Sequence, residues 1–276
     1  MIRANPFTGC PQLSSRSACR HSGDAPIHLW FCLPLVLCFI VAVGTSVVQA
    51  QAQGTIETEP ENARAIVIGF VGGFVHSDDR RHSEVQLIHQ LQASYDENVK
   101  ARVFENRQRE QAHKFILDSI AAPDHKLSPQ EKARTHIILF GHSWGASSVV
   151  YLARELQRDG VPVFLTVQVD SIRKHGEDDS NIPSNVKQAV NFYQNSGILH
   201  GRSEITAHDK SKTIILGNYR YHYAKEPAAC SHYPWYNRLL FKGHTAIECD
   251  PQVWSRIADL IQMQLPQSEV RMAAAR

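Results

Sequence analysis

The sequence has 276 residues, of which 43% are hydrophobic and 20% charged, close to the averages of ordinary globular domains. This length leaves room for one large domain or two small ones, and the composition excludes a disordered, collagenous or coiled-coil chain. Lysine and arginine number 29 against 27 acidic residues, which gives a net charge of +2. Such a balance argues against nucleic acid as the main partner, because phosphate binding needs clustered cations.

Residues 1–52 have the pattern of a secretory leader. Residues 25–56 contain no charged side chain, and residues 29–43 (LWFCLPLVLCFIVAV) form a nearly continuous apolar run. Small residues ending at Ala50 then match a signal-peptidase site. We predict a signal peptide, or alternatively a signal-anchor in which residues 29–48 span the membrane; a buried core helix is the least favoured interpretation. The rest of the chain is expected to be exported, periplasmic or secreted, and to meet a membrane only through this segment.

Cysteine usage agrees with export. Four of the six cysteines lie in the leader, and only Cys230 and Cys249 remain beyond it. An even pair in an oxidising compartment favours a disulfide, which would close a loop of about 20 residues and stabilise the fold by about 3 kcal/mol. Two unpaired buried thiols are the alternative. Neither cysteine has a partner at ligand spacing and no helix carries HxxxH or HExxH, so we expect no metal site.

After a polar linker at residues 53–62, strand and helix patterns alternate. Short apolar runs predict buried strands at residues 65–70, 99–105, 136–140 and 161–169. Helices are predicted from a Ser83–Gln86 capping box to about residue 95, from an Asn106 cap to about residue 120, and over residues 146–156. Residues 123–134 are expected to form a loop, in which Ser128 and Pro129 could begin a short helical turn.

Beyond Asp170 the pattern weakens. Strands are expected at residues 188–193 and 213–216, and residues 251–265 predict a last helix with Asp250 as its N-cap and a proline at its first position. Residues 266–276 are left as a tail. The alternation predicts an α/β fold with a mostly parallel central sheet and helices on both faces, in one domain over residues 63–265.

The motif that carries chemistry is the pentapeptide GHSWG at residues 141–145. It lies between the strand at 136–140 and the helix at 146–156, and in that setting it predicts a nucleophile elbow. The turn would be so tight that a side chain at either glycine would clash. Ser143 Oγ would project above the sheet at a helix N-terminus, where free N–H groups stabilise a developing oxyanion. The alternative is a glycine-rich turn without catalytic function.

With this motif the sequence resembles the α/β-hydrolase superfamily, whose esterases, lipases and thioesterases often carry Gly-His-Ser-x-Gly. The resemblance covers residues 63–265 and implies an α/β-hydrolase fold with a triad in the order Ser, acid, His. The limited length leaves room for a small cap domain at most. His142, beside the nucleophile, is expected to point away from Ser143 Oγ and to pack under the elbow.

Asp170 is the favoured acid, because it follows the buried strand that comes after the nucleophile. Asp209 is the main alternative, and Asp178 and Asp179 lie in a charged loop expected to be solvated. The favoured base is His244, in a segment just before the last helix, where the resemblance places the histidine and where the predicted disulfide would hold it.

Two backbone N–H groups should form the oxyanion hole. The resemblance assigns one to Trp144, the residue after the nucleophile. The other should come from the loop after the first strand, which lacks the usual His-Gly pair, and we choose Phe74 over Gly73 or Val75.

These residues predict an exported serine hydrolase that cleaves carboxylic esters through an acyl-enzyme and needs no metal or organic cofactor. The expected partner is a small-molecule or lipid ester. A thioesterase, a lipase or an acyltransferase with the same triad is the alternative, as is an inactive binding protein. Aromatic residues in the segment between the acid and the base either line an acyl pocket or cover the core: Tyr219, Tyr221, Tyr223, Tyr233, Trp235 and Tyr236.

Overall fold

The computed structural model describes residues 64–121 and 128–265, which belong to one compact unit of the chain. The predicted leader (1–52), linker (53–62) and tail (266–276) lie outside the described residues. Within the described part, no helix has the length and apolar character needed to cross a bilayer.

A six-stranded parallel sheet forms the centre of this unit, in the order β2-β1-β3-β4-β6-β8. The strands are β1 (Arg64–Val71), β2 (Val99–Glu105), β3 (Thr135–His142), β4 (Val163–Val169), β6 (Val186–Gln194) and β8 (Ile214–Tyr221). All four apolar runs predicted as strands lie in it, and the two weaker predictions correspond to β6 and the beginning of β8. The expectation of an α/β fold is confirmed.

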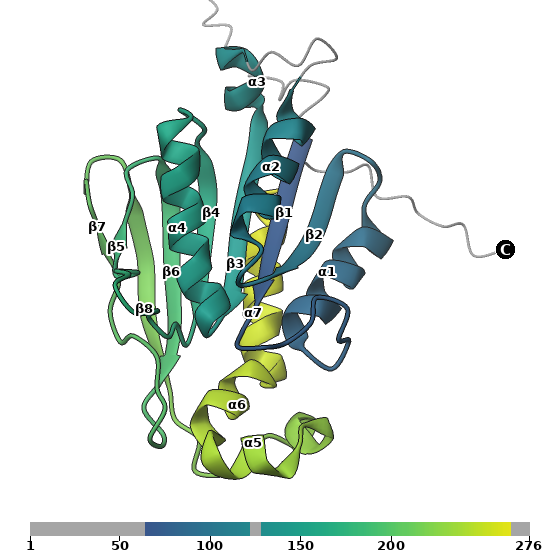
Figure 1. The fold of residues 1–276 in the computed structure, drawn as a ribbon, viewed down its shortest axis with the longest axis vertical. Helices are drawn as coiled ribbons and strands as arrows, with labels where there is room; N and C mark the ends of the chain where they lie inside the picture. Colours follow the sequence, from purple (N-terminus) through teal and green to yellow (C-terminus); the bar gives the residue numbers. More distant parts are fainter. Residues whose placement is uncertain (1–63, 122–127, 266–276) are drawn as a thin grey trace, which may run out of the picture. The chain divides into compact units, whose positions relative to one another are not determined.

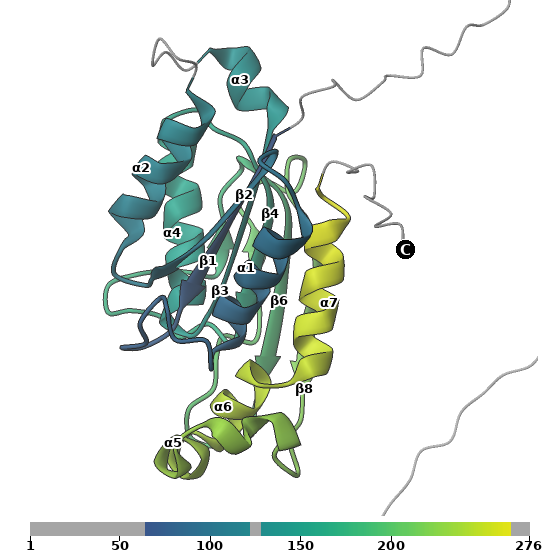
Figure 2. The same ribbon diagram turned by 90° about the vertical axis from the view of Figure 1, so that its right-hand side faces the viewer.

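Helices cover both faces of the sheet, with α2 and α4 on one face and α1 and α7 on the other (Figures 1 and 2). The helices are α1 (Ser83–Ser94), α2 (Arg109–Ile120), α3 (Pro129–Arg134), α4 (Trp144–Arg158), η1 (Ala228–His232), α5 (Trp235–Leu240), α6 (Lys242–Glu248) and α7 (Pro251–Gln262). The short helices α5 and α6 lie beyond the carboxyl ends of the strands, at the lower end of both views.

Alternation along the central strands divides the core into two apolar layers. In β1, Val67 packs with Ile257 of α7, whereas its neighbour Ile68 packs on the opposite face with Ile116 of α2 and Val149 of α4. Successive side chains of a strand point to opposite faces, so a sheet covered on both sides needs continuous apolar runs. This is why β1, β3 and β4 could be recognised from sequence.

Two of the predicted helix caps are wrong. Helix α1 has His82 at its N-cap without a side-chain hydrogen bond, and Ser83 Oγ instead donates to the Glu248 carbonyl at 2.7 Å. Helix α2 begins after Gln108, and Asn106 Nδ2 donates to the Gly73 carbonyl at 2.5 Å. In both cases the side chain that was predicted to cap a helix instead donates a hydrogen bond to a backbone carbonyl far away in the sequence.

Elsewhere the structure contains more regular secondary structure than the sequence predicted. The possible helical turn at Ser128 and Pro129 is the start of α3, which is longer than expected, and Ser128 and Glu131 form a complete capping box. A separate two-stranded sheet, β5 (Asn181–Ile182) with β7 (Thr206–Ala207), was not predicted because each strand has only two residues. The cap of α7 is confirmed, since the Asp250 side chain accepts from the N–H of Gln252.

Candidate active site

The turn between β3 and α4 consists of one residue, Ser143, with φ of 57° and ψ of −124°. An L-residue rarely adopts a positive φ, so this backbone is strained unless its surroundings hold it. The Ser143 N–H donates to the Val169 carbonyl at 3.0 Å, and its own carbonyl accepts from Ile172 at 3.2 Å and from Ala146 at 3.1 Å. The strand pairing and the helix start thus fix the turn from both sides.

The two motif glycines are needed because backbone atoms occupy the space of their side chains. A Cβ on Gly145 would lie 2.3 Å from the Phe70 carbonyl oxygen, and one on Gly141 would lie 2.7 Å from the Gly145 carbonyl. Close packing of β3 and α4 against the end of β1 therefore excludes any larger residue. The predicted nucleophile-elbow geometry is present.

Ser143, His244 and Asp170 form one hydrogen-bonded chain. His244 Nε2 lies 2.9 Å from Ser143 Oγ, and His244 Nδ1 lies 2.7 Å from Asp170 Oδ2. All three side chains are buried. A hydroxyl beside an imidazole whose other nitrogen faces a carboxylate is the arrangement of an activated nucleophile, its base and the group that orients the base.

Asp170 is held at the end of β4 by more than the imidazole. Oδ1 accepts from the N–H groups of Gly201 at 2.7 Å and Gln194 at 3.2 Å, and Oδ2 accepts from Gln194 Nε2 at 2.7 Å. Burial alone raises its pKa, but the hydrogen bonds from His244 and Gln194 outweigh burial and hold the pKa below the ordinary value. The carboxylate is thus charged and fixed in orientation at neutral pH.

The alternative acids lie elsewhere. Asp209 accepts from Ser211 within its own turn, and Asp178 accepts from Ser180 on the surface. Asp179, expected to be solvated, is fully buried: Ser171 Oγ and Arg202 Nε each donate to it at 2.5 Å. It stabilises the loop after β4, a role that its charged sequence neighbours did not reveal.

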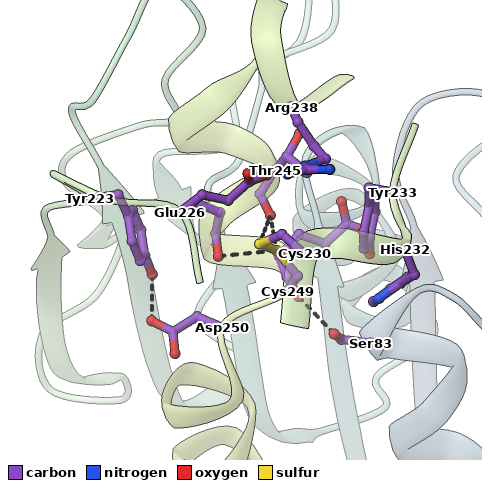
Figure 3. The surroundings of a disulfide bond; sticks show 12 residues. Ser83, Tyr223, Glu226, Cys230, His232, Tyr233, Arg238, Thr245, Cys249 and Asp250 are labelled. Carbon is purple, nitrogen blue, oxygen red and sulfur yellow. Dashed lines mark hydrogen bonds and ion pairs between the residues drawn. A yellow bond between two sulfur atoms is a disulfide. The ribbon is translucent and has the colours of Figure 1, made fainter. Parts of the chain in front are cut away.

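His244 lies in the short helix α6 and not in a loop as predicted. Close contact fixes this helix, since a Cβ on Gly243 would lie 2.0 Å from the Ser196 carbonyl oxygen. The predicted disulfide between Cys230 and Cys249 is present, with 5.3 Å between the Cα atoms, and joins η1 to the residue after α6 (Figure 3).

Next to the disulfide, Tyr223 points toward Asp250, and its hydroxyl donates to that carboxylate at 2.8 Å (Figure 3). This bond anchors the start of α7 directly after the disulfide. His244 therefore lies on a segment that is held by the disulfide and by the hydrogen bond between Tyr223 and Asp250.

The two predicted oxyanion donors lie on neighbouring segments. Trp144 is the first residue of α4, and its ring meets the Phe74 ring edge-on with 5.6 Å between centroids. Of the three residues considered for the second donor, Val75 already donates its N–H to the Gly72 carbonyl at 3.1 Å. The choice of Phe74 over Gly73 stays a prediction.

The aromatic residues between acid and base divide into two groups. Tyr219 and Tyr221 pack against Phe192 of the core, and Tyr223 and Tyr233 are buried. These side chains cover the core, which is one of the two interpretations left open by the sequence. In contrast, Trp235 and Tyr236 of α5 are exposed.

A buried polar cluster lies next to His244, formed by His82, Glu84, His142, Tyr233 and Glu248. His142 links the two, with 4.4 Å between the centroids of its ring and the His244 ring; that its side chain packs under the elbow stays a prediction. The other members were not predicted, because they come from distant parts of the sequence and no spacing links them.

Burial dominates the protonation of this cluster. It lowers the pKa of His142 to about 4, and burial together with the nearby Glu248 raises the pKa of Glu84 to about 8. Burial also lowers the pKa of His82, but the hydrogen bond to Glu248 and the nearby carboxylates of Glu248, Glu84 and Asp79 together outweigh burial and raise that pKa overall. Without a bound ligand, His142 and Glu84 are thus neutral at pH 7.

No protein-family model and no curated protein matches the chain. Solved structures that resemble it include RedJ, a thioesterase from Streptomyces coelicolor (11% identity, TM-score 0.41), which is covered over 90% of its length by 74% of this chain. A putative YdeN-like hydrolase from Pectobacterium atrosepticum has 12% identity and a TM-score of 0.39, with 74% of this chain covering 94% of it. A cutinase-like protein from Cryptococcus sp. has 14% identity and a TM-score of 0.39, at 74% and 96% coverage.

Resemblances at this level of identity and TM-score indicate no substrate and carry no argument about the fold. The fold assignment rests on the architecture of this chain. The parallel sheet has helices on both faces, and a strained serine connects β3 to α4 at the carboxyl edge. By this architecture the chain has the fold of the α/β-hydrolase superfamily.

Proposed function

We propose that the protein is an exported serine hydrolase that cleaves carboxylic esters through Ser143, His244 and Asp170. The observation that carries the proposal is the continuous hydrogen-bonded chain from Ser143 Oγ through both imidazole nitrogens to a fixed carboxylate. A serine hydroxyl is a weak nucleophile at neutral pH and needs an adjacent, oriented base to become reactive. The chain supplies both the base and its orientation.

In the proposed reaction His244 Nε2 accepts the proton of Ser143 Oγ as the oxygen attacks the acyl carbonyl carbon. The Asp170 carboxylate stabilises the resulting imidazolium and does not itself take the proton. The Trp144 N–H and a second N–H from the loop after β1 bind the oxyanion of the tetrahedral intermediate. His244 then protonates the departing alcohol, and water repeats the sequence to release the acid.

Two features support export and substrate class. The apolar leader and the disulfide fit an oxidising compartment outside the cytosol. The triad itself suits any activated acyl group. We choose a carboxylic ester of modest size over a thioester or a lipid ester, because the helices beyond the sheet are short and form no large cap within the described residues.

The test uses the full chain produced in an oxidising host, a fluorophosphonate probe, and p-nitrophenyl esters of increasing acyl length beside an acyl thioester. We expect labelling and ester turnover in the wild type. Ser143→Ala should abolish labelling and lower turnover by a factor of about 10⁴ or more. The matched control is Ser147→Ala, which removes a buried hydroxyl one helical turn away, bonded to Glu177.

The acyl-length profile separates an esterase from a lipase, and faster thioester cleavage would point to a thioesterase. A folded wild-type protein that neither labels nor turns over any ester contradicts the proposal and leaves an inactive binding protein as the better interpretation. Equal labelling of wild type and Ser143→Ala would contradict the assignment of the nucleophile.

A further inference from the structure

The buried polar cluster holds a group of side chains with the chemistry of a metal site. His82, Glu84 and Glu248 each place one ligand atom so that the three lie within 4.8 Å of one another. All three residues are buried. His142 adds a further nitrogen, with Nδ1 at 3.5 Å from Glu248 Oε2 and 4.0 Å from Glu84 Oε1.

Glu84 is the observation that distinguishes this group from an ordinary hydrogen-bonded network. It is 0% exposed, and neither of its carboxylate oxygens has a hydrogen-bond partner among the described residues. His142 Nε2 is likewise without a partner in that part of the chain. A buried carboxyl group without a partner is costly whether it is charged or neutral, so such groups normally pair or coordinate a metal.

We propose that His82, Glu84 and Glu248 bind a divalent transition-metal ion, Zn²⁺ in first place, with His142 as the fourth ligand. One or two imidazole nitrogens with two carboxylate oxygens match the ligands that Zn²⁺ takes in proteins. The two carboxylates would neutralise the charge of the ion. Ligand atoms around tetrahedral Zn²⁺ lie about 3.4 Å apart. Small side-chain rotations would reach this spacing, because the ligand atoms lie within 4.8 Å of one another and the hydrogen-bonded His82 Nδ1 and Glu248 Oε1 would move apart.

The surroundings support this assignment, because outer partners already orient two of the ligands. The Tyr233 hydroxyl donates to Glu248 Oε1 at 2.9 Å, and Asp79 Oδ2 faces His82 Nε2 at 3.7 Å. Metal-binding histidines usually present their other nitrogen to a carboxylate or carbonyl, and metal-binding carboxylates are usually hydrogen-bonded. In the structure His82 Nδ1 bonds directly to Glu248, and the ion would replace this bond.

The proposed ion would join three elements that meet next to His244. Glu84 comes from α1, Glu248 from the end of α6, and His142 from the end of β3 beside the nucleophile. Four protein ligands leave no open position, which is the pattern of a structural site. The prediction of no metal site rested on ligand spacings along one helix, and these ligands are up to 166 positions apart.

The test measures metal retention by the full chain, produced without a histidine tag. Protein treated with EDTA is reloaded with Zn²⁺, freed of excess by gel filtration, and analysed by mass spectrometry for metal content. We expect about one Zn²⁺ per wild-type chain and a rise in Tm of about 5 °C relative to the EDTA-treated protein. Glu84→Gln should retain less than about a tenth of that metal and lose the Tm rise.

Glu105→Gln is the matched control, since Glu105 is a buried carboxylate on β2, outside the cluster, and should leave retention unchanged. If Glu84→Gln does not fold, His82→Asn takes its place with the same expectation. Retention of no Zn²⁺ by the wild type, equal retention by both glutamate variants, or preference for Ca²⁺ over Zn²⁺ overturns the proposal. None of these measurements depends on esterase activity.

Discussion

Two neighbouring groups of histidines and carboxylates differ in how their polar atoms are paired. In the first, His244 has a partner on each ring nitrogen and every carboxylate oxygen of Asp170 accepts a hydrogen bond. In the second, which adjoins it through the His142 ring, both oxygens of Glu84 lack a partner among the described residues. The same residue types are therefore paired differently in the two groups. Complete pairing suits the proposed proton transfer, and the unpaired oxygens of Glu84 are the basis of the proposed metal site.

The largest effect is expected from a substitution in the first group, at the carboxylate of Asp170. Asp170→Asn should lower kcat for ester hydrolysis by a factor of about 10⁴, because the amide no longer selects the imidazole tautomer that accepts the serine proton. Asp209→Asn should leave kcat within about twofold of wild type, since Asp209 only caps its own turn. Steady-state kinetics on one ester checks both. The reverse order of effects would move the acid to Asp209.

Two glycines, one in the elbow and one in the loop after β1, separate the effects of steric clash and of an unfavourable φ. Gly145→Ala should destabilise the fold by about 3 kcal/mol or more, because its Cβ would lie 2.3 Å from the Phe70 carbonyl oxygen. Gly73→Ala should cost about 1 kcal/mol, since its Cβ meets open space and only its φ of 47° is unfavourable. Urea unfolding gives both values. Equal costs would show that backbone packing at the elbow is loose.

Removing the disulfide tests how much it contributes to the position of His244. Replacing Cys230 and Cys249 together with alanine should lower the free energy of unfolding by about 3 kcal/mol in the chain-entropy description. We expect kcat to fall less than for any triad variant, because the contact of Gly243 with Ser196 still positions α6. Thermal unfolding and ester kinetics on the same sample check this. A kcat loss as large as that of Asp170→Asn would make the disulfide essential for placing His244.

The smallest expected effect is the pH dependence that Asp170 contributes to stability. Its pKa in the folded state lies below the ordinary value of 3.8. Its stabilising contribution is therefore complete above that ordinary value and is lost as pH falls through the folded pKa. The difference in unfolding free energy between wild type and Asp170→Asn should be constant above about pH 5 and shrink below about pH 4. A difference independent of pH would mean that this carboxylate has no perturbed pKa.

Much of the sheet and one of the two polar groups could be predicted from sequence. Residues 136–140 and the glycines around Ser143 carry a local signature, because a buried strand and a tight turn each restrict neighbouring residues. Asp170 and His244 followed from the order of elements. The cluster around Glu84 had no such signature, since its members meet only after α1 and α6 pack together.

The wrong predictions share a physical cause. Ser83 and Asn106 have side chains suited to helix caps, yet each bonds to a distant backbone carbonyl. His244 was predicted in a loop because it comes immediately before the last helix, where the resemblance places the base. The segment instead forms the short helix α6, and Gly243 lets this helix pack closely against Ser196. Local preferences of about 1 kcal/mol are readily overridden by such tertiary contacts.

Among the described residues, the non-glycine positions with positive φ are Ser143 and Asp170. Backbone strain in the described part of the chain is thus concentrated at the proposed nucleophile and at the residue proposed as the acid that orients its base. A glycine at position 143 would relax the turn and remove the reacting atom at once. Selection for folding stability and selection for activity therefore act in opposite directions at this position. Stabilising substitutions are expected elsewhere in the fold.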